Sequence, residues 1–464
     1  MAAPTYDELL ALVEALRAAV ARLEADNARL RIELDAARRA GKRQAAPFRK
    51  GPPKPEPQTP GRKSGDDHGR HGHRPPPPPD RIHEHYDAPL PDACPHCRGE
   101  LAEAEVVAQF QTEIPRVPIR RRFDVHVGHC RRRGRRVQGR HELQTSDALG
   151  AAASQIGPDA QAAIVHLNKV AGLSHGKIAA VLDGLFGIDP TRGASARINL
   201  RAANRLAPAY AEIVEATRSA ERLTVDETGW RVGGWPAWLH AWVGGEATCY
   251  AIDPLRGADV LERVIGPNWD GVLVHDGFAS YDRFADAPHQ QCLAHVLRRA
   301  REALATAAGG AVRFPRAVVD LFGGAVHLRN RFHRGEASRD ELTAARDDFE
   351  DRLAALVNRS SSVPAYATFA GHLGRHFESW FTFLTDPSVP ATNWEAEQAI
   401  RPAVVNRKVW GGNRTWVGAR AQSVLMSVLE TCRRQARSAL DFVSRTLRGF
   451  GSRVLPTPVL LATR

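Results

Sequence analysis

Apolar side chains recur every seven residues near the start of this 464-residue chain. One series is leucine throughout and the alternating series is apolar at three of four positions; the two comprise Leu9, Leu16, Leu23, Leu30 and Val13, Val20, Asn27, Leu34. This heptad predicts a coiled coil over residues 1–38. Asn27 in the seam lowers stability but selects a parallel dimer, and Asp26 and Arg31 can pair between helices. The alternative is a single amphipathic helix packed on the rest of the chain.

A helical pattern occupies residues 145–222. Ser174 is placed to cap a helix that runs through Leu185, the Gly187–Pro190 segment breaks it, and a second helix runs from Thr191 to Leu206. Two helices around a turn are typical of a helix-turn-helix. The second helix is basic through Arg192, Arg197, Arg201 and Arg205. These arginines fit DNA contact, although packing of a plain helical hairpin explains the same spacing.

Strand-like alternation of polarity begins at Leu223. Three runs separated by glycines predict an antiparallel meander: Leu223–Trp230, Trp238–Trp242 and Thr248–Ile252. A helical stretch, Ala258–Ile265, leads to the continuous apolar run Val272–Val274, as expected for an inner strand buried on both faces. Helical periodicity returns over about Arg298–Phe383.

Another helix is predicted to begin near Thr392. Thr392 and Glu395 fit a capping box, in which hydroxyl and carboxylate satisfy each other's free backbone amides. Glu395 then has a structural role, and Glu397 is the better candidate for chemistry. Three meander strands, a helix, an inner strand and a later acid-bearing helix follow the ribonuclease H-like order.

The charge and cysteine content narrow the class of protein. With 64 basic and 52 acidic residues the formal net charge is +12, which favours a polyanionic partner through counterion release. A merely basic protein is the alternative. No apolar run approaches a membrane span, and Met1–Leu10 is mildly acidic, unlike a secretory signal. Six cysteines in this length exclude a disulfide scaffold, so we expect a cytosolic protein.

Two further segments precede the helical one. Residues 39–90 hold twelve of the 31 prolines, which predicts a basic, poorly folded linker whose histidines, including His68, His71 and His73, are solvated. Residues 91–144 contain the knuckle Cys94-Pro-His-Cys97 and, 33 residues later, Cys130. Three thiolates predict a structural zinc site, with His129, His126 or His141 as the fourth ligand; a metal-free knuckle is the alternative. The alternating residues Val106–Val127 predict a small ribbon.

Three carboxylates stand where the predicted elements would bring them together. Asp226 lies in the first meander strand, Asp276 follows the inner strand, and Glu397 lies in the last helix. Converging carboxylates repel one another unless divalent cations neutralise them, and oxygen ligands suit magnesium. Two such ions serve phosphodiester displacement. The alternative is that Asp226, Asp276 and Glu397 are ordinary surface residues, three of the 52 acidic residues of the chain, and share no site.

These residues resemble the insertion-sequence-66 family of bacterial transposases. The resemblance rests on Asp226-Glu-Thr-Gly-Trp230, Asp276-Gly-Phe-Ala-Ser-Tyr281, His289-Gln-Gln-Cys-Leu-Ala-His295, the stretch from Thr392-Asn through Glu397 to Arg401-Pro402, and Gly134-Arg-Arg-Val-Gln-Gly-Arg140. It implies a DDE transposase that cuts at its element's ends and joins the freed 3′-hydroxyls to target DNA. It also implies that Asp226, Asp276 and Glu397 bind Mg²⁺ or Mn²⁺, as two ions.

The predicted fold is a multidomain α+β protein. It comprises a coiled coil (1–38), a linker (39–90), a zinc-binding segment (91–144), a helical DNA-binding segment (145–222), a ribonuclease H-like α/β core (223–297 and 386–450), a helical insertion (298–385) and a tail (451–464). The resemblance implies DNA partners, namely element terminal repeats and target DNA, together with self-association, small accessory proteins and a location at the nucleoid.

Several residues depart from the family pattern, and others have two possible roles. Arg133 occupies the fourth zinc position, Trp394 replaces an asparagine and Gln398 replaces an arginine. Cys292 and His295 suggest a second metal pair, with packing or DNA positioning as the alternative. A further basic group follows the predicted Glu397 helix and can meet phosphates or be ordinary surface: Arg401, Arg407, Lys408 and Arg414.

The sequence therefore predicts a magnesium-dependent transposase. Two rival hypotheses remain: a degenerate relative that binds element ends without cutting them, and a plain metal nuclease that cuts but does not join strands.

Overall fold

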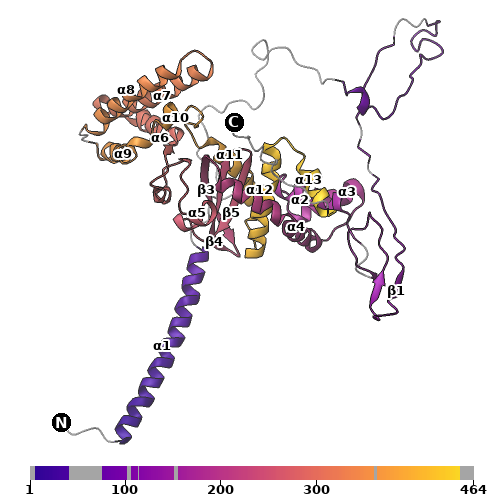
Figure 1. The fold of residues 1–464 in the computed structure, drawn as a ribbon, viewed down its shortest axis with the longest axis horizontal. Coiled ribbons are helices and arrows are strands. Elements are labelled where there is room, and N and C mark those ends of the chain that lie inside the picture. The colour runs from indigo at the N-terminus through magenta and orange to yellow at the C-terminus, as the bar shows by residue number, and fades with distance from the viewer. Residues whose placement is uncertain are drawn as a thin grey trace. The chain divides into compact units, whose positions relative to one another are not determined.

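The structure is a computed structural model of the chain, and it describes residues 6–40, 76–101, 106–112, 114–115, 117–150, 155–359 and 363–449 (Figure 1). The predicted tail, 451–464, and His68, His71 and His73 of the linker lie outside these residues. The chain divides into two compact units, one of residues 1–47 with 121–464 and one of residues 48–120. Among the described helices, none has the length and apolar character needed to cross a bilayer.

Helix α1 (Tyr6–Ala40) covers the predicted heptad. Its described seam side chains are exposed, with Leu16 57%, Leu23 68% and Leu30 58% accessible. A stripe of this kind remains in water unless another surface covers it. The coiled coil itself stays a prediction.

The predicted ribbon over Val106–Val127 is wrong in position. Within the described part of that stretch no strand occurs before Val127, and the hairpin is instead β1 (Val127–His129) paired antiparallel with β2 (Arg136–Gln138). Gly134, at φ +64°, supplies the left-handed residue that reverses the chain between them.

Three helices follow: α2 (Pro158–Lys169), α3 (His175–Phe186) and α4 (Arg192–Arg218). The predicted boundaries of α3 hold, because Ser174 Oγ accepts from the Lys177 N–H and Gly187 adopts φ +60° at the C-cap. The predicted end of α4 at Leu206 is wrong. The helix continues through Pro208 because its buried stripe continues through Ala209 and Ile213.

The central sheet has the strand order β5-β4-β3-β6-β7. The predicted meander is present as β3 (Arg222–Val232), β4 (Trp235–Gly244) and β5 (Ala247–Asp253), all antiparallel. After α5 (Ala258–Ile265), β6 (Val272–His275) joins parallel to β3, and β7 (His289–Gln291) joins parallel to β6. Strand β6 is therefore paired on both sides, as its apolar run predicted.

The two faces of the sheet are covered by different helices. On β3, Leu223 and Val225 pack into a core with α4, α5 and α12 (Trp416–Arg434). Trp230 and Val232, on the alternate positions, pack against α11 (Trp394–Trp410). Because strand side chains alternate between faces, Asp226 shares the α11 face with Trp230.

Helix α12 also protects the edge strand β5. Three hydroxyls spaced four residues apart, those of Ser423, Ser427 and Thr431, accept from the backbone N–H groups of Ile252, Tyr250 and Thr248. These bonds satisfy donors that an open sheet edge leaves free. Helix α13 (Ala439–Leu447) packs with α2 on the same core.

The predicted insertion is helical where described, with a core of its own. It contains α6 (Leu293–Thr306), α7 (Arg313–His333), α8 (Arg339–Val357), α9 (Pro364–Arg375) and α10 (Thr382–Thr385). Phe322, Phe349 and Phe381 stack at its centre. Figure 1 shows these helices gathered together.

Candidate functional site

The three predicted acids come from three neighbouring elements. Asp226 lies on β3, and Asp276 directly follows β6, the parallel neighbour of β3. Glu397 lies in the first turn of α11, which packs on the face of β3 that bears Asp226. The middle of β3, the carboxyl end of β6 and the first turn of α11 thus place the three acids in one region.

The pKa of Asp226 reflects its burial and its acidic neighbours. The pKa of Asp226 is raised to about 8, chiefly by burial, and the charges of Glu227, Asp276 and Glu397 raise it further. One oxygen of Asp226 accepts from the Glu227 N–H at 2.9 Å, and one oxygen of Asp276 accepts from the Phe278 N–H at 3.1 Å. Within the described residues neither aspartate forms an ion pair. Of the three acids, only Glu397 has a basic ion-pair partner, His295, within the described residues.

This donor set fits a hard divalent cation. Carboxylate oxygens are the ligands that Mg²⁺ and Mn²⁺ prefer, and a cation would relieve the repulsion that raises the Asp226 pKa. In the described part of the chain no three His, Cys, Asp or Glu side chains converge closely enough to hold an ion as they stand. A shared ion therefore requires these side chains to move closer together.

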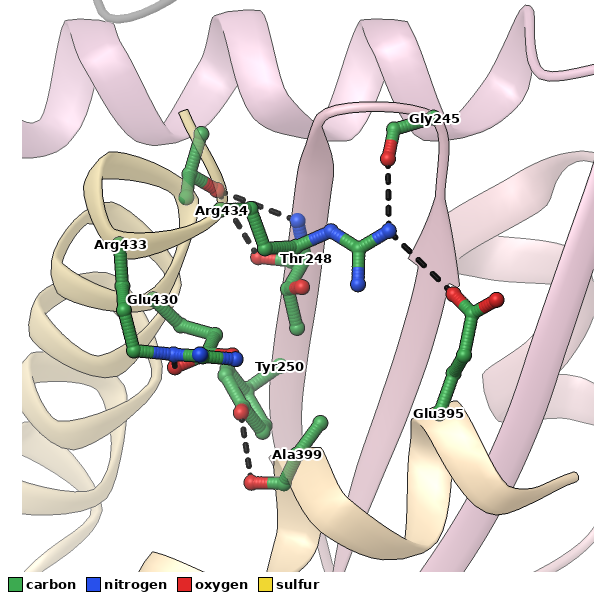
Figure 2. A network of polar contacts seen from close by, with 9 residues as sticks. Gly245, Thr248, Tyr250, Glu395, Ala399, Glu430, Arg433 and Arg434 are labelled. Carbon is green, nitrogen blue, oxygen red and sulfur yellow. Dashed lines mark hydrogen bonds and ion pairs between the residues drawn. The ribbon is translucent and has the colours of Figure 1, made fainter. Parts of the chain in front are cut away.

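The helix that carries Glu397 is fastened to the sheet by a polar network (Figure 2). Tyr250 of β5 donates its hydroxyl hydrogen to the Ala399 carbonyl at 2.7 Å. Arg434 of α12 donates to the Gly245 carbonyl at 2.7 Å and contacts Glu395 at 3.3 Å, as Figure 2 shows. Arg222 approaches the other Glu395 oxygen at 3.8 Å.

The predicted capping box is therefore wrong. Asn393, not Thr392, is the N-cap of α11, and its side chain makes no capping bond. The Glu395 carboxylate turns to the two guanidinium groups, which are stronger partners than one backbone amide. Glu395 is structural, as expected, but through ion pairs.

Cys292 and His295, suggested by the sequence as a second metal pair, have different surroundings. His295 Nε2 lies 3.6 Å from Glu397 Oε1. Helix α6, which carries His295, begins where the Leu293 N–H donates to the Ala391 carbonyl at 3.0 Å. Cys292 is instead 2% exposed, and burial raises the pKa of its thiol. Cys292 packs in the interior, whereas His295 faces the acids.

A buried cluster on the opposite face of β3 was not predicted. The Glu227 side chain is 1% exposed; Arg256 contacts it at 2.6 Å and the Tyr281 hydroxyl donates to it at 2.6 Å. The Arg256 guanidinium lies 4.6 Å from the Trp238 ring centre and 3.7 Å from that of Phe278. The signal was present in the strand alternation, which directs Glu227 away from Asp226.

Two histidines fix the turn after Asp276. His289 Nε2 lies 2.9 Å from the Phe284 carbonyl, so it must carry the proton. His289 Nδ1 then accepts from His275 Nε2 at 2.8 Å, and His275 Nδ1 accepts from the Gly277 N–H at 3.1 Å. Burial holds the pKa of His275 well below its usual range, which keeps this chain of bonds neutral.

Comparison with known proteins shows the family of the chain. Residues 153–421, more than half of the chain, match the model of the family described as "Transposase IS66 family". The chain belongs to the IS66 transposase family. "Uncharacterized protein y4qI" of Sinorhizobium fredii (strain NBRC 101917 / NGR234) is 26% identical over 278 residues, which make up 51% of this chain and 49% of that protein. The chain thus spans about half the length of that relative.

Two departures from the expected IS66 pattern flank Glu397. Trp394 is 61% exposed at the start of α11, and Gln398 is half-buried. Neither contacts Glu397 through a hydrogen bond in the described residues.

The basic residues predicted to meet DNA in this IS66-family chain divide into two groups. Exposed side chains belong to Arg192, Arg197 and Arg201 on α4, to Arg401 and Lys408 on α11, and to Arg414 in the following loop. Arg407 is instead half-buried, and its guanidinium donates to the Gly229 carbonyl and, at 3.2 Å, to the Thr228 hydroxyl. Arg407 therefore fastens α11 to β3.

The cysteines predicted to bind zinc lie in two turns of identical design. In the first, the Cys94 N–H donates to the Gly99 carbonyl and the Arg98 N–H to the Cys94 carbonyl. In the second, the Cys130 N–H donates to the Arg135 carbonyl and the Gly134 N–H to the Cys130 carbonyl. Arg98 and Gly134, the matching fifth residues, both have φ near +60°.

The two turns differ in the side chain at the fourth position, which is Cys97 in the first and Arg133 in the second. Backbone N–H groups of His96 and Cys97 lower the pKa of the Cys94 thiol, which favours the thiolate that binds zinc. Each turn belongs to a different compact unit, so the complete site stays a prediction.

Proposed function

We propose that this IS66-family chain is a DDE transposase with a ribonuclease H-like core, in which Asp226, Asp276 and Glu397 hold Mg²⁺ or Mn²⁺. It cuts DNA at the ends of its element and joins the freed 3′-hydroxyls to target DNA. The observation that carries this proposal is the placement of the three acids: Asp226 on β3, Asp276 directly after its parallel neighbour β6, and Glu397 on α11, which packs on the face of β3 that bears Asp226. The strand order, with three antiparallel strands and then two parallel ones, supports the core assignment.

A pair of divalent cations, when bound, activates the attacking oxygen and stabilises the leaving oxygen of a phosphodiester. The chain's own contribution is positioning. Strands β3 and β6 hold the two aspartates on a rigid sheet, and α11, fastened by Tyr250, Arg434 and Arg407, presents Glu397 to them. The exposed arginines of α4 and the basic residues after Glu397 hold the DNA backbone.

The test uses purified protein, a duplex containing the element's end, and Mg²⁺ or Mn²⁺. Asp226→Asn and Glu397→Gln are expected to bind DNA but to cleave at least roughly 10³-fold more slowly, because charge neutralisation at phosphate is lost. Asp270→Asn, an exposed acid just before β6, is the matched control and stays near wild type. Binding without cleavage by the wild type, even with accessory proteins, supports the degenerate relative, and cleavage without joining supports a plain nuclease.

We also propose a structural zinc ion held by Cys94, Cys97 and Cys130, with His129 as the leading fourth ligand. The equivalence of the two cysteine turns supports it. Protein purified without chelator is expected to contain about one equivalent of zinc, and Cys97→Ser to contain much less. Less than roughly a tenth of an equivalent in the wild type would contradict the proposal.

Self-association through α1 is the remaining part of the proposed function. The exposed leucine stripe supports a parallel dimer of two such helices. Because its substrate is DNA, the protein acts at the nucleoid. Any small accessory proteins of the element act there with it.

A further inference from the structure

Two helices of the insertion contact the segments that carry two of the three acids. On α6, His295 Nε2 lies 3.6 Å from Glu397 Oε1. On α9, the His372 ring lies against the turn that follows Asp276, because a Cβ placed on Gly277 would be 3.5 Å from His372 Cε1. Gly277, at φ +91°, lets the backbone turn there without a side chain of its own. The insertion therefore brings side chains of its own to both segments.

Arg299 connects these two helices. It lies four residues after His295 on α6, which is about one helical turn along the same face. Its guanidinium lies 4.2 Å from the centre of the Phe369 ring, and Phe369 lies one turn before His372 on α9. Contact with an aromatic face holds a guanidinium in place without neutralising it. Arg299 is exposed and forms no ion pair within the described residues, so its charge remains available to an anion.

The half-buried His372 has unused hydrogen-bonding capacity. Its ring packs edge-on against Trp380, with 5.8 Å between ring centres, and within the described residues neither ring nitrogen is hydrogen-bonded. The pKa of His372 is lowered to about 4, chiefly by burial and then by the charges of His376, Arg299 and Arg375. The ring is therefore neutral at pH 7, with one N–H to donate. The three charges that act on it are all positive, so its surroundings favour an anion.

A guanidinium and an imidazole N–H from neighbouring helices suit the two non-bridging oxygens of a phosphodiester. The scissile phosphate lies at the three acids, whereas His372 lies at the residue after Asp276, so a neighbouring phosphate of the same strand fits better. We propose that Arg299 and His372 bind the DNA phosphate next to the scissile one, so that the insertion holds the strand against the three acids. This inference rests on the proposed transposase function and adds a phosphate subsite to it.

The test replaces single phosphates of the end-containing duplex by neutral methylphosphonates, one position at a time, with Ca²⁺ in place of Mg²⁺. Wild-type affinity should fall roughly tenfold when the phosphate bound by Arg299 is replaced, since a charge-assisted contact is lost. Arg299→Ala should bind the unmodified duplex roughly tenfold more weakly, and the methylphosphonate at that position should then cost less than about twofold. Arg298→Ala is the matched control, because this exposed neighbour lies about 100° around α6 and should keep the wild-type loss.

A second pair of variants tests His372 by the same scan. His372→Ala should lose part of the sensitivity at the position that Arg299→Ala identifies, whereas His372→Gln, which keeps an N–H donor, should retain most of it. The melting temperature of each variant shows whether it is folded. If Arg299→Ala and the folded His372 variants keep the full wild-type loss at every position, the inference is overturned and the transposase proposal stands. Absence of any DNA binding by wild type overturns both.

Discussion

The His295 imidazole and the Glu397 carboxylate face each other, with Nε2 3.6 Å from Oε1. His295 belongs to α6 and Glu397 to α11, and 101 residues, most of them in the helical insertion, separate them in the sequence. The contact is longer than a hydrogen bond, and both side chains are about one third exposed. It therefore orients the Glu397 carboxylate more than it stabilises the fold.

Replacing His295 by Ala should therefore slow DNA cleavage by roughly fivefold, corresponding to about 1 kcal/mol of lost positioning. His295→Gln, which keeps a donor, should recover part of the rate. Initial cleavage rates at saturating DNA measure the effect, with His327→Ala on α7 as an exposed histidine control. Equal rates for His295→Ala and wild type would show that the contact has no role.

Asp226 makes stability depend on pH in a direction that can be measured. Its pKa in the folded chain, about 8, is above its usual 3.8, so the folded protein binds the proton more tightly than the unfolded one. The stabilisation is complete below pH about 4 and is lost as the pH rises through about 8.

Asp226→Asn removes this loss, so the variant should unfold with a free energy about 1–3 kcal/mol above wild type at pH 8.5 and close to it at pH 4. Urea denaturation in the presence of EDTA measures the free energies of unfolding of wild type and variant at the two pH values. Added Mg²⁺ should raise the melting temperature of the wild type at pH 8.5 but not that of the variant. A variant less stable than wild type at both pH values contradicts the prediction.

Arg256 should contribute far more stability than a surface arginine. Its removal leaves the Glu227 carboxylate, 1% exposed, without its cation, so Arg256→Ala is expected to cost about 2–4 kcal/mol. Arg263→Ala, which removes a more exposed pair with Asp253, should cost less than about 1 kcal/mol. Chemical denaturation compares the two, and equal costs would mean that the cluster does not brace the loop after Asp276.

Disrupting the leucine stripe of α1 should dissociate the proposed dimer. Leu16→Asp/Leu23→Asp places charges in the seam, where pairing helices must exclude water. Sedimentation equilibrium of the full chain should change from dimer to monomer, whereas Arg17→Ala, outside the seam, should not change it. If the wild type is already monomeric at micromolar concentration, α1 does not mediate self-association.

Arg407 and the α4 arginines should respond differently to alanine. Arg197→Ala/Arg201→Ala is expected to lower the salt dependence of DNA binding by about 2 in log–log slope, close to 0.9 per phosphate contact. Arg407→Ala should leave the slope unchanged and lower stability instead, since its guanidinium is bonded within β3. A reduced slope for Arg407→Ala would return that residue to the DNA surface.

Local signals predicted the elements well. The Ser174 cap and Gly187 bracket α3, and the glycine-separated strands and the apolar run Val272–Val274 became β3 to β6. A local pattern failed where distant residues offered a stronger partner. Thr392 and Glu395 have the spacing of a capping box. The Glu395 carboxylate instead pairs with Arg222 and Arg434, which are distant in the sequence. Similarly, the helix predicted to end at Leu206 continues to Arg218, because burial of Ala209 and Ile213 extends its apolar stripe.

The amino-acid order alone identified the side chains proposed to carry the chemistry, because period-two and period-3.6 patterns place Asp226 in a strand, Asp276 directly after a strand and Glu397 in a helix turn. Only the tertiary structure decided which of them meet. Pairing of β6 beside β3 and packing of α11 on one face bring Asp226 to Glu397 and send Glu227 to the other side. That choice depends on contacts between residues far apart in the sequence, such as Arg222 with Val272 in the β3–β6 pairing and Thr228 with Arg407 between β3 and α11, whose energies no local pattern contains.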